Sequence, residues 1–235
     1  MAERPVFIPW TEGHRLVKEI SFAFTWNAGF APVQKKKNIT ALHAAAAAQG
    51  HSPLLEVSTK SGEPLGQHLS AFSLKVATRD YGEIPLECAY QGSKVFEQGG
   101  PFMDLYAVDT RAAKKDPRIR DSGRLTEFRF NGLVFQTEPK TAFYDWLYIS
   151  AIAPYREYLR RLEAYVGFTD IEFNPGKSIN CQARSCAMFV AMVRKNVLER
   201  ALTSQDAFIA EIGPDSAEQP HSRPARPNES NLFEV

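Results

Sequence analysis

Glu87, Gln91 and Lys94 place a carboxylate, an amide and an ammonium group within the segment 86–96 of the chain. At about 100° per residue of an α-helix, these positions fall within a sector of about 60°. Apolar residues fill most of the other positions, so a helix here is expected to be covered on most sides. Because an unpaired buried charge is costly, the three side chains must meet partners. The spacing allows two interpretations: a glutamate–lysine pair at the edge of a solvated face, or the wall of a polar pocket.

A second polar set occupies the segment 168–182. Asp170 and Glu172 alternate there with apolar residues, which predicts a strand that presents both carboxylates on one side. A loop follows and ends at Asn180, before a helix. Two carboxylates with this spacing most often belong to a solvated face, and a metal site needs further His, Asp or Glu ligands nearby. The segment contains none, so no metal is expected.

The elements that must position these residues are strands and helices in irregular order. The clearest signal is a hairpin over 125–136, where two alternating runs flank Asn131 and Gly132. An alanine-rich helix is expected to begin at a cap formed by Asn38 or Thr40. The absence of a strand–helix–strand rhythm favours the α+β class over a parallel α/β sheet. Further strands are expected over 4–10, 18–30, 53–61, 68–80 and 168–173, and helices over 85–98, 143–152, 154–166 and 182–200.

The composition limits the classes of protein to which the chain can belong. Of 235 residues, 44% are hydrophobic and 23% are charged, and the formal net charge of +1 gives no overall field that attracts nucleic acid or membranes. No signal-peptide layout and no run of about 18 apolar residues occur, so we expect no membrane contact and a cytoplasmic location. Cys88, Cys181 and Cys186 form no CxxC pair, which argues against a zinc ribbon or a disulfide framework.

Two blocks of the sequence resemble the YbiA/NADAR family. The first, LSAFSLKVATRDYGEIPLECAYQGSKVF, has the leucine-serine-x-phenylalanine motif of the family, followed by a glutamate, an aromatic residue, a glutamine and a lysine at the family spacing. The second, KSINCQARSCAMFVAMVR, has the asparagine that precedes a helix closing near an arginine. The matching residues are Leu69, Ser70, Phe72, Glu87, Tyr90, Gln91 and Lys94 in the first block, and Asp170 or Glu172, Asn180 and Arg194 near the second.

The resemblance implies a single α+β catalytic domain over residues 65–212. Residues 1–64 then form an extension packed on this domain. The segment 213–235 is rich in proline, serine and charge, and is predicted to be a disordered tail.

The resemblance also implies a hydrolase that cleaves an N-glycosidic bond, including release of ADP-ribose from guanine, without a metal or other cofactor. Its partner is then a nucleotide or a DNA that carries a modified guanine. Glu87 receives the acid–base role and Lys94 the role of gripping the opened ribose carbon, covalently or otherwise. Asp170 is expected to assist catalysis, and the substrate is expected to contact Tyr90, Gln91, Trp146, Glu172, Asn180 and Gln182.

The chain departs from the family pattern at three places. Ala71 stands where the family commonly has asparagine, and Cys88 stands where histidine often follows the glutamate. The expected tryptophan-x-x-x-lysine segment is not recognisable, and Trp146 is a candidate substitute for its tryptophan. These departures affect the prediction of the reaction more than the prediction of the fold.

Two alternative functions follow from these departures. Cys88 or Cys181 could act as a thiolate nucleophile if its pKa is lowered. A YbiA-like enzyme of this kind could hydrolyse the nitrile of 7-cyano-7-deazaguanine in DNA, as a DpdC-like member of a deazaguanine DNA-modification cluster. A buried cysteine is, however, more often a small apolar residue. The other alternative is a module that binds a modified base without catalysis.

Overall fold

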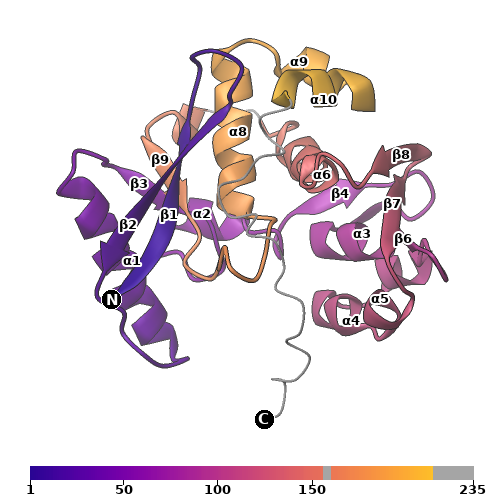
Figure 1. Ribbon diagram of the computed structural model, residues 1–235, viewed down its shortest axis with the longest axis horizontal. Helices are drawn as coiled ribbons and strands as arrows, with labels where there is room; N and C mark the ends of the chain where they lie inside the picture. The colour runs from indigo at the N-terminus through magenta and orange to yellow at the C-terminus, as the bar shows by residue number, and fades with distance from the viewer. Residues whose placement is uncertain (156–159, 214–235) are drawn as a thin grey trace.

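A four-stranded sheet is built from segments that lie far apart in the sequence (Figure 1). The structure is a computed structural model, and it describes residues 1–155 and 160–213. β1 (Ala2–Pro9) and β2 (Val17–Phe24) form an antiparallel pair at one side of this sheet. β9 (Gly167–Thr169) lies between β1 and β3 (Leu54–Glu56), and it runs parallel to β3. The first two strands of the chain therefore share a sheet with a strand that begins at residue 167.

Helices cover both faces of this sheet. Because successive strand residues point to opposite faces, Val6 and Phe7 of β1 belong to different hydrophobic clusters. Val6 packs with α1 (Pro32–Ala47), and Phe7 packs with the central helix α8 (Gln182–Arg194). Figure 1 shows α8 standing between the sheet and the rest of the molecule. Together with a two-stranded and a three-stranded sheet and the remaining helices, this arrangement confirms the α+β class.

The start of α1 corrects the prediction of a cap at Asn38 or Thr40. The helix begins at Pro32, and Ala31 precedes it in an extended conformation. A proline at the first position suits a helix start, because its amide would lack a helical partner anyway. Asn38 is instead fully buried within the helix, and its amide nitrogen donates to the carbonyl of Asn27 at 3.0 Å.

The predicted hairpin around Asn131 and Gly132 is confirmed. β7 (Leu125–Phe130) pairs antiparallel with β8 (Leu133–Gln136), and the two turn residues have φ values of 51° and 82°. Positive φ at both central residues matches the right-handed twist of the flanking strands. The hairpin packs its aromatic face on α6 (Ala142–Ile152), with the rings of Phe128 and Phe143 4.5 Å apart.

The helix expected over 85–98 is shorter than predicted. α3 covers Leu86–Gly92, and Lys94 opens the strand β6 (Lys94–Phe96) on the free edge of β7. A side chain at Gly92 would come within 2.5 Å of the Tyr106 ring, so the close packing there requires glycine. Tertiary pairing with β7 therefore ends the helix before the glycine pair at 99–100.

The other predicted helices agree with the structure in part. α8 ends at Arg194, because Asn196 takes a left-handed conformation with φ of 55° before α9. The helix expected over 154–166 includes residues 156–159, and the predicted tail includes 214–235; both stretches lie outside the described residues. The remaining elements are α2 (Pro64–His68), β4 (Lys75–Ala77), β5 (Glu83–Pro85), η1 (Met103–Ala107), α4 (Thr110–Lys115), α5 (Arg118–Asp121), α9 (Leu198–Ala201) and α10 (Gln205–Ile212).

A membrane-crossing helix is not found in the part of the chain that the structure describes: none of its helices combines the necessary length with sufficient apolar character.

Candidate functional site

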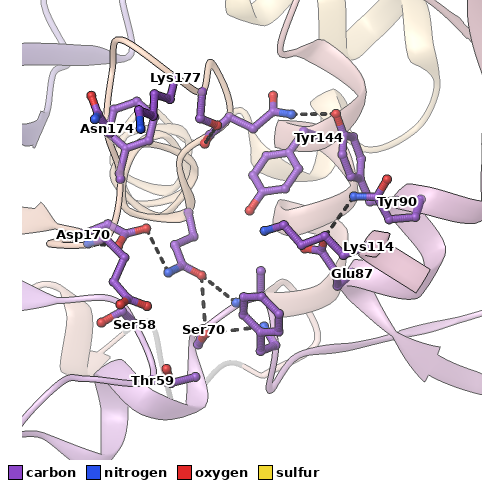
Figure 2. Close-up of a pocket in the computed structure, with 18 residues that line it drawn as sticks. Ser58, Thr59, Ser70, Glu87, Tyr90, Lys114, Tyr144, Asp170, Asn174 and Lys177 are labelled. Atoms are coloured by element: carbon purple, nitrogen blue, oxygen red, sulfur yellow. Dashed lines mark hydrogen bonds between the residues drawn. The ribbon is translucent and has the colours of Figure 1, made fainter. Parts of the chain in front are cut away.

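A cavity of about 520 Å³ lies where α3, α4, the start of α8 and the loop after β9 meet (Figure 2). Its volume falls within the range typical of small-molecule sites. Carboxylates, amides, hydroxyls and lysines line it together with a few aromatic rings. The lining residues are Ser58, Thr59, Ser70, Ala71, Phe72, Glu87, Tyr90, Gln91, Lys114, Tyr144, Asp170, Glu172, Phe173, Asn174, Lys177, Ser178, Asn180 and Gln182.

The α3 wall of the cavity carries Glu87 and Gln91, one helical turn apart. Both side chains are buried, and the Gln91 amide nitrogen donates to Glu87 Oε1 at 2.9 Å. Lys94 Nζ donates to Gln91 Oε1 at 2.7 Å. The Gln91 amide therefore links the carboxylate to the ammonium group. Glu87 and Gln91 of the polar stripe therefore line a pocket, which agrees with the second interpretation of the spacing for these two residues.

Lys94 lies behind this wall and is not among the lining residues. Its Nζ atom is 4.6 Å from the centroid of the Tyr90 ring, which does face the cavity. Burial lowers the pKa of Lys94 to about 8, partly opposed by the negative charge of Glu87 and reinforced by the positive charge of Lys114. A substantial neutral fraction of this amine is thus available a little above neutral pH.

The opposite wall is organised around Asp170, which directly follows β9. Gln182, the first residue of α8, donates from Nε2 to Asp170 Oδ2 at 3.0 Å and accepts the backbone N–H of Ala71 at 2.7 Å. The backbone N–H of Glu172 donates to Asp170 Oδ1 at 3.0 Å. Burial raises the pKa of Asp170 to about 6. Figure 2 shows Asp170 and Glu87 on opposite sides of the cavity.

Asn180 and Tyr90 connect the two walls. Asn180 Nδ2 donates to the Tyr90 hydroxyl at 2.7 Å, and burial raises the pKa of that hydroxyl, which therefore keeps its proton. Within the described part of the chain, the buried Oδ1 atom of Asn180 has no hydrogen-bond partner. Both residues line the cavity, and their hydrogen bond ties the segment before α8 to α3.

Two lysines at the cavity were not found by sequence reasoning. Lys114, in the last turn of α4, lies on the Glu87 side, with Nζ 5.4 Å from the Phe72 ring centroid. Lys177 lies on the other side, beyond Asp170 (Figure 2). The NPGKS segment was the available signal for Lys177, whereas no local pattern marks Lys114. Glu172 also lines the cavity and forms an ion pair with Lys35 of α1 at 3.3 Å.

Besides Lys94, three predicted site residues do not line the cavity. Cys88 is fully buried beside Leu105 and Ala113, its thiol donates to the Val108 carbonyl, and burial raises its pKa to about 11. Cys181 is buried too, and burial raises its thiol pKa well above the ordinary value. Trp146 packs in the aromatic cluster between α6 and the β7–β8 hairpin. None of the three lines the cavity.

Metal ligands are not gathered at this site. No group of three or more His, Cys, Asp and Glu side chains that could hold a metal ion occurs within residues 1–155 and 160–213. The two carboxyl groups of Glu87 and Asp170 thus face a cavity whose nearby cations are lysines.

Comparison with known proteins gives one family. A family model described as DarT1-associated NADAR antitoxin matches residues 2–222. The match extends over residues 2–64, which lie outside the resemblance seen in the sequence. No curated protein matches the chain.

Proposed function

Because the chain belongs to the family of DarT1-associated NADAR antitoxins, we propose that it is a hydrolase that removes ADP-ribose from guanine bases of DNA. It would thereby reverse a modification made by a partner toxin. The observation that carries the proposal is the placement of two carboxyl groups, on Glu87 and Asp170, on opposite sides of one nucleotide-sized cavity. Cleavage of an N-glycosidic bond at the ribose needs such groups around the sugar carbon.

The proposed reaction adds water across the bond between the anomeric ribose carbon and a guanine nitrogen. The bond electrons pass to the guanine nitrogen, which takes up a proton, and the hydroxyl of water forms a new bond to the ribose carbon. An oxocarbenium-like centre develops at that carbon, and an ionised carboxylate stabilises it. We assign Glu87 to accepting the proton of water and returning it to the leaving base, and Asp170 to stabilising the positive charge from the opposite wall.

The rim lysines suit the diphosphate of ADP-ribose. Lys114 and Lys177 carry positive charge at the two sides of the cavity, and both side chains are exposed enough to meet phosphate oxygens. Asn180 and Tyr90 line the cavity and would contact the guanine or the ribose. These contacts would orient the glycosidic bond between the two carboxyl groups.

Lys94 would act from behind the α3 wall. Its bond to Gln91 keeps that amide directed at Glu87, and the negative charge of Glu87 favours the charged form of Lys94. A covalent role, in which the amine attacks the opened ribose carbon, would require Lys94 to be neutral and to leave Gln91. The lowered pKa of Lys94 supports the first of these requirements.

The geometry gives less support to nitrile hydrolysis. A thiolate nucleophile needs a lowered pKa and access to the substrate. Cys88 and Cys181 are both buried, lie outside the cavity lining, and have raised pKa values.

Mass spectrometry of the products separates these functions. The protein is incubated with an oligonucleotide that carries ADP-ribosylated guanine, and in parallel with one that carries 7-cyano-7-deazaguanine. We expect free ADP-ribose and unmodified guanine from the first and no change in the second, with Glu87→Gln as the inactive control. Loss of the nitrile from the second oligonucleotide would overturn the proposal, and so would binding of the first without any release.

A further inference from the structure

Glu56 is a buried carboxyl group that the proposed reaction does not use. It ends β3, is 2% exposed, and does not line the cavity. Three donors meet its oxygens: the hydroxyl of Ser58 at 2.7 Å, the hydroxyl of Thr169 at 2.7 Å, and the backbone N–H of Ile171 at 2.9 Å. Burial of a carboxyl group is costly, and the three hydrogen bonds offset part of this cost.

Two of these partners flank Asp170 in the chain. Thr169 is the last residue of β9, and Ile171 is the first residue beyond Asp170. One oxygen of Glu56 holds Thr169 and the other holds Ile171, so the backbone on each side of Asp170 is fixed to β3. The Asp170 side chain leaves from between these two points and meets Gln182 at the cavity.

We propose that Glu56 is a positioning residue for the hydrolysis proposed above, on which this inference rests: it clamps the two neighbours of Asp170 and so fixes where the Asp170 carboxylate lies. Glu56 does not touch the substrate in this role. A shift of the Asp170 carboxylate by about 1 Å would cost up to about a hundredfold in rate.

Burial and a neighbouring charge oppose the ionised form of Glu56, whereas its three hydrogen-bond donors favour it. Asp170 beyond β9 is its charged neighbour, and His43 of α1 contacts Thr169; Glu172 acts on Asp170, Asp170 acts on Cys181, and Glu63 acts on His43. Burial, and then the charge of Asp170, raise the pKa of Glu56 to about 8. His43 Nε2 lies 2.8 Å from the Thr169 hydroxyl, and burial lowers the pKa of the ring to about 4.

A glutamine at position 56 would reproduce the neutral state of the clamp. Its oxygen can accept from Ser58 and Ile171, and its amide can donate to the Thr169 hydroxyl, whose own hydrogen then goes to His43. In the wild type, a pH above about 8 ionises Glu56 and places a second negative charge behind Asp170. The glutamine variant has no such transition.

The test measures kcat and KM on an oligonucleotide with ADP-ribosylated guanine for the wild type, Glu56→Ala, Glu56→Gln and Asp170→Asn. We expect Glu56→Ala to lower kcat by about a hundredfold with little change in KM. Glu56→Gln should stay within about threefold of wild type at pH 7 and retain more of its kcat than the wild type at pH 9. Asn38→Ala removes a buried amide in α1, away from Glu56, and serves as the control for simple destabilisation.

Each outcome decides the proposal. A folded Glu56→Ala protein with wild-type kcat overturns it, as does a Glu56→Gln protein that loses as much kcat at pH 7 as Glu56→Ala does. If Glu56→Ala does not fold, Thr169→Val removes one arm of the clamp, and an unchanged kcat in that variant also overturns it. A wild type that releases no ADP-ribose, with Asp170→Asn indistinguishable from it, instead refutes the proposed function.

Discussion

The two walls of the cavity reach their geometry by different routes. On the α3 wall, Glu87 and Gln91, with Lys94 behind them, come from one short stretch of chain and are joined by two hydrogen bonds within it. On the opposite wall, Asp170 depends on Gln182 at the start of α8 and, through its neighbours, on Glu56 at the end of β3. The first wall is a property of local spacing, and the second is a property of the assembled sheet.

This difference predicts how each wall responds to substitutions. The Glu87 and Gln91 side chains form their hydrogen bonds within their own stretch, so a substitution at either should affect chemistry more than folding. The Asp170 wall joins α8, β9, β3 and the 69–72 motif, so a change at any of these points should move the carboxylate. Four substitutions sharpen or break this comparison.

The largest effect is expected from Glu87→Gln on the α3 wall. The substitution keeps the size of the side chain and removes its charge, so turnover should fall by at least about a hundredfold while the melting temperature changes little. Steady-state release of ADP-ribose and thermal unfolding measure the two effects. Glu83→Gln, at an exposed position of β5 just before α3, is the matched control and should keep wild-type turnover. Wild-type turnover in a folded Glu87→Gln protein would remove Glu87 from the mechanism.

A smaller effect is expected from Gln182→Leu on the Asp170 wall. The substitution leaves Asp170 Oδ2 and the backbone N–H of Ala71 without this partner, so the carboxylate should shift and kcat should fall by about tenfold. The same assay measures it, with exposed Gln136→Leu in β8 as the control. If kcat stays within twofold of the wild type, the Asp170 wall is held without this cross-link.

Lys114→Ala tests the electrostatics between the walls through the pKa of Lys94. The positive charge of Lys114 lowers that pKa, so its removal should raise it, and the neutral form of Lys94 should appear only at higher pH. Reductive methylation with carbon-13 formaldehyde, followed by an NMR titration of the Lys94 signal, measures the change. The neighbouring exposed Lys115→Ala, which does not line the cavity, should shift the signal less. An equal shift of the Lys94 pKa in both variants would mean that the charge of Lys114 acts on Lys94 no more strongly than the charge of Lys115 does.

The smallest effect is expected from Cys88→Ser. The hydroxyl can still donate to the Val108 carbonyl, and the side chain lies outside the cavity, so release of ADP-ribose should stay within about twofold of the wild type. The same variant should also leave any nitrile hydrolysis unchanged if the thiol is structural. Loss of a nitrile-hydrolysing activity would reinstate Cys88 as a nucleophile.

Local patterns predicted much of the fold and part of the site. Alternating residues predicted β1, β2 and the β7–β8 hairpin, because strand and turn preferences act over a few residues. The spacing of Glu87 and Gln91 likewise predicted a shared face, because one turn of helix fixes it. The division at residue 64 and the roles of the site residues stay predictions.

Other features required contacts between distant segments. Lys94 was predicted to continue the helix, but it lies in β6, which pairs with the edge of β7. No pattern within 86–96 indicates this pairing. Trp146 was predicted to bind substrate, but the aromatic face of the β7–β8 hairpin packs against it. Lys114 has no local signal, because its place at the cavity depends on how α4 packs on α3.

The sequence by itself determined the α+β class, the polar stripe of α3 and the family resemblance, because each depends on residue types at short spacing. Only the tertiary structure decided that Asp170 faces Glu87 across a cavity and that Glu56 stands behind it. The bonds from Thr169 and Ile171 to Glu56 join residues 113 and 115 positions apart. Such bonds require β3 and β9 to be paired in the sheet. This pairing, rather than any local preference, buries the carboxylate of Asp170, for which the local pattern predicts a solvated strand face.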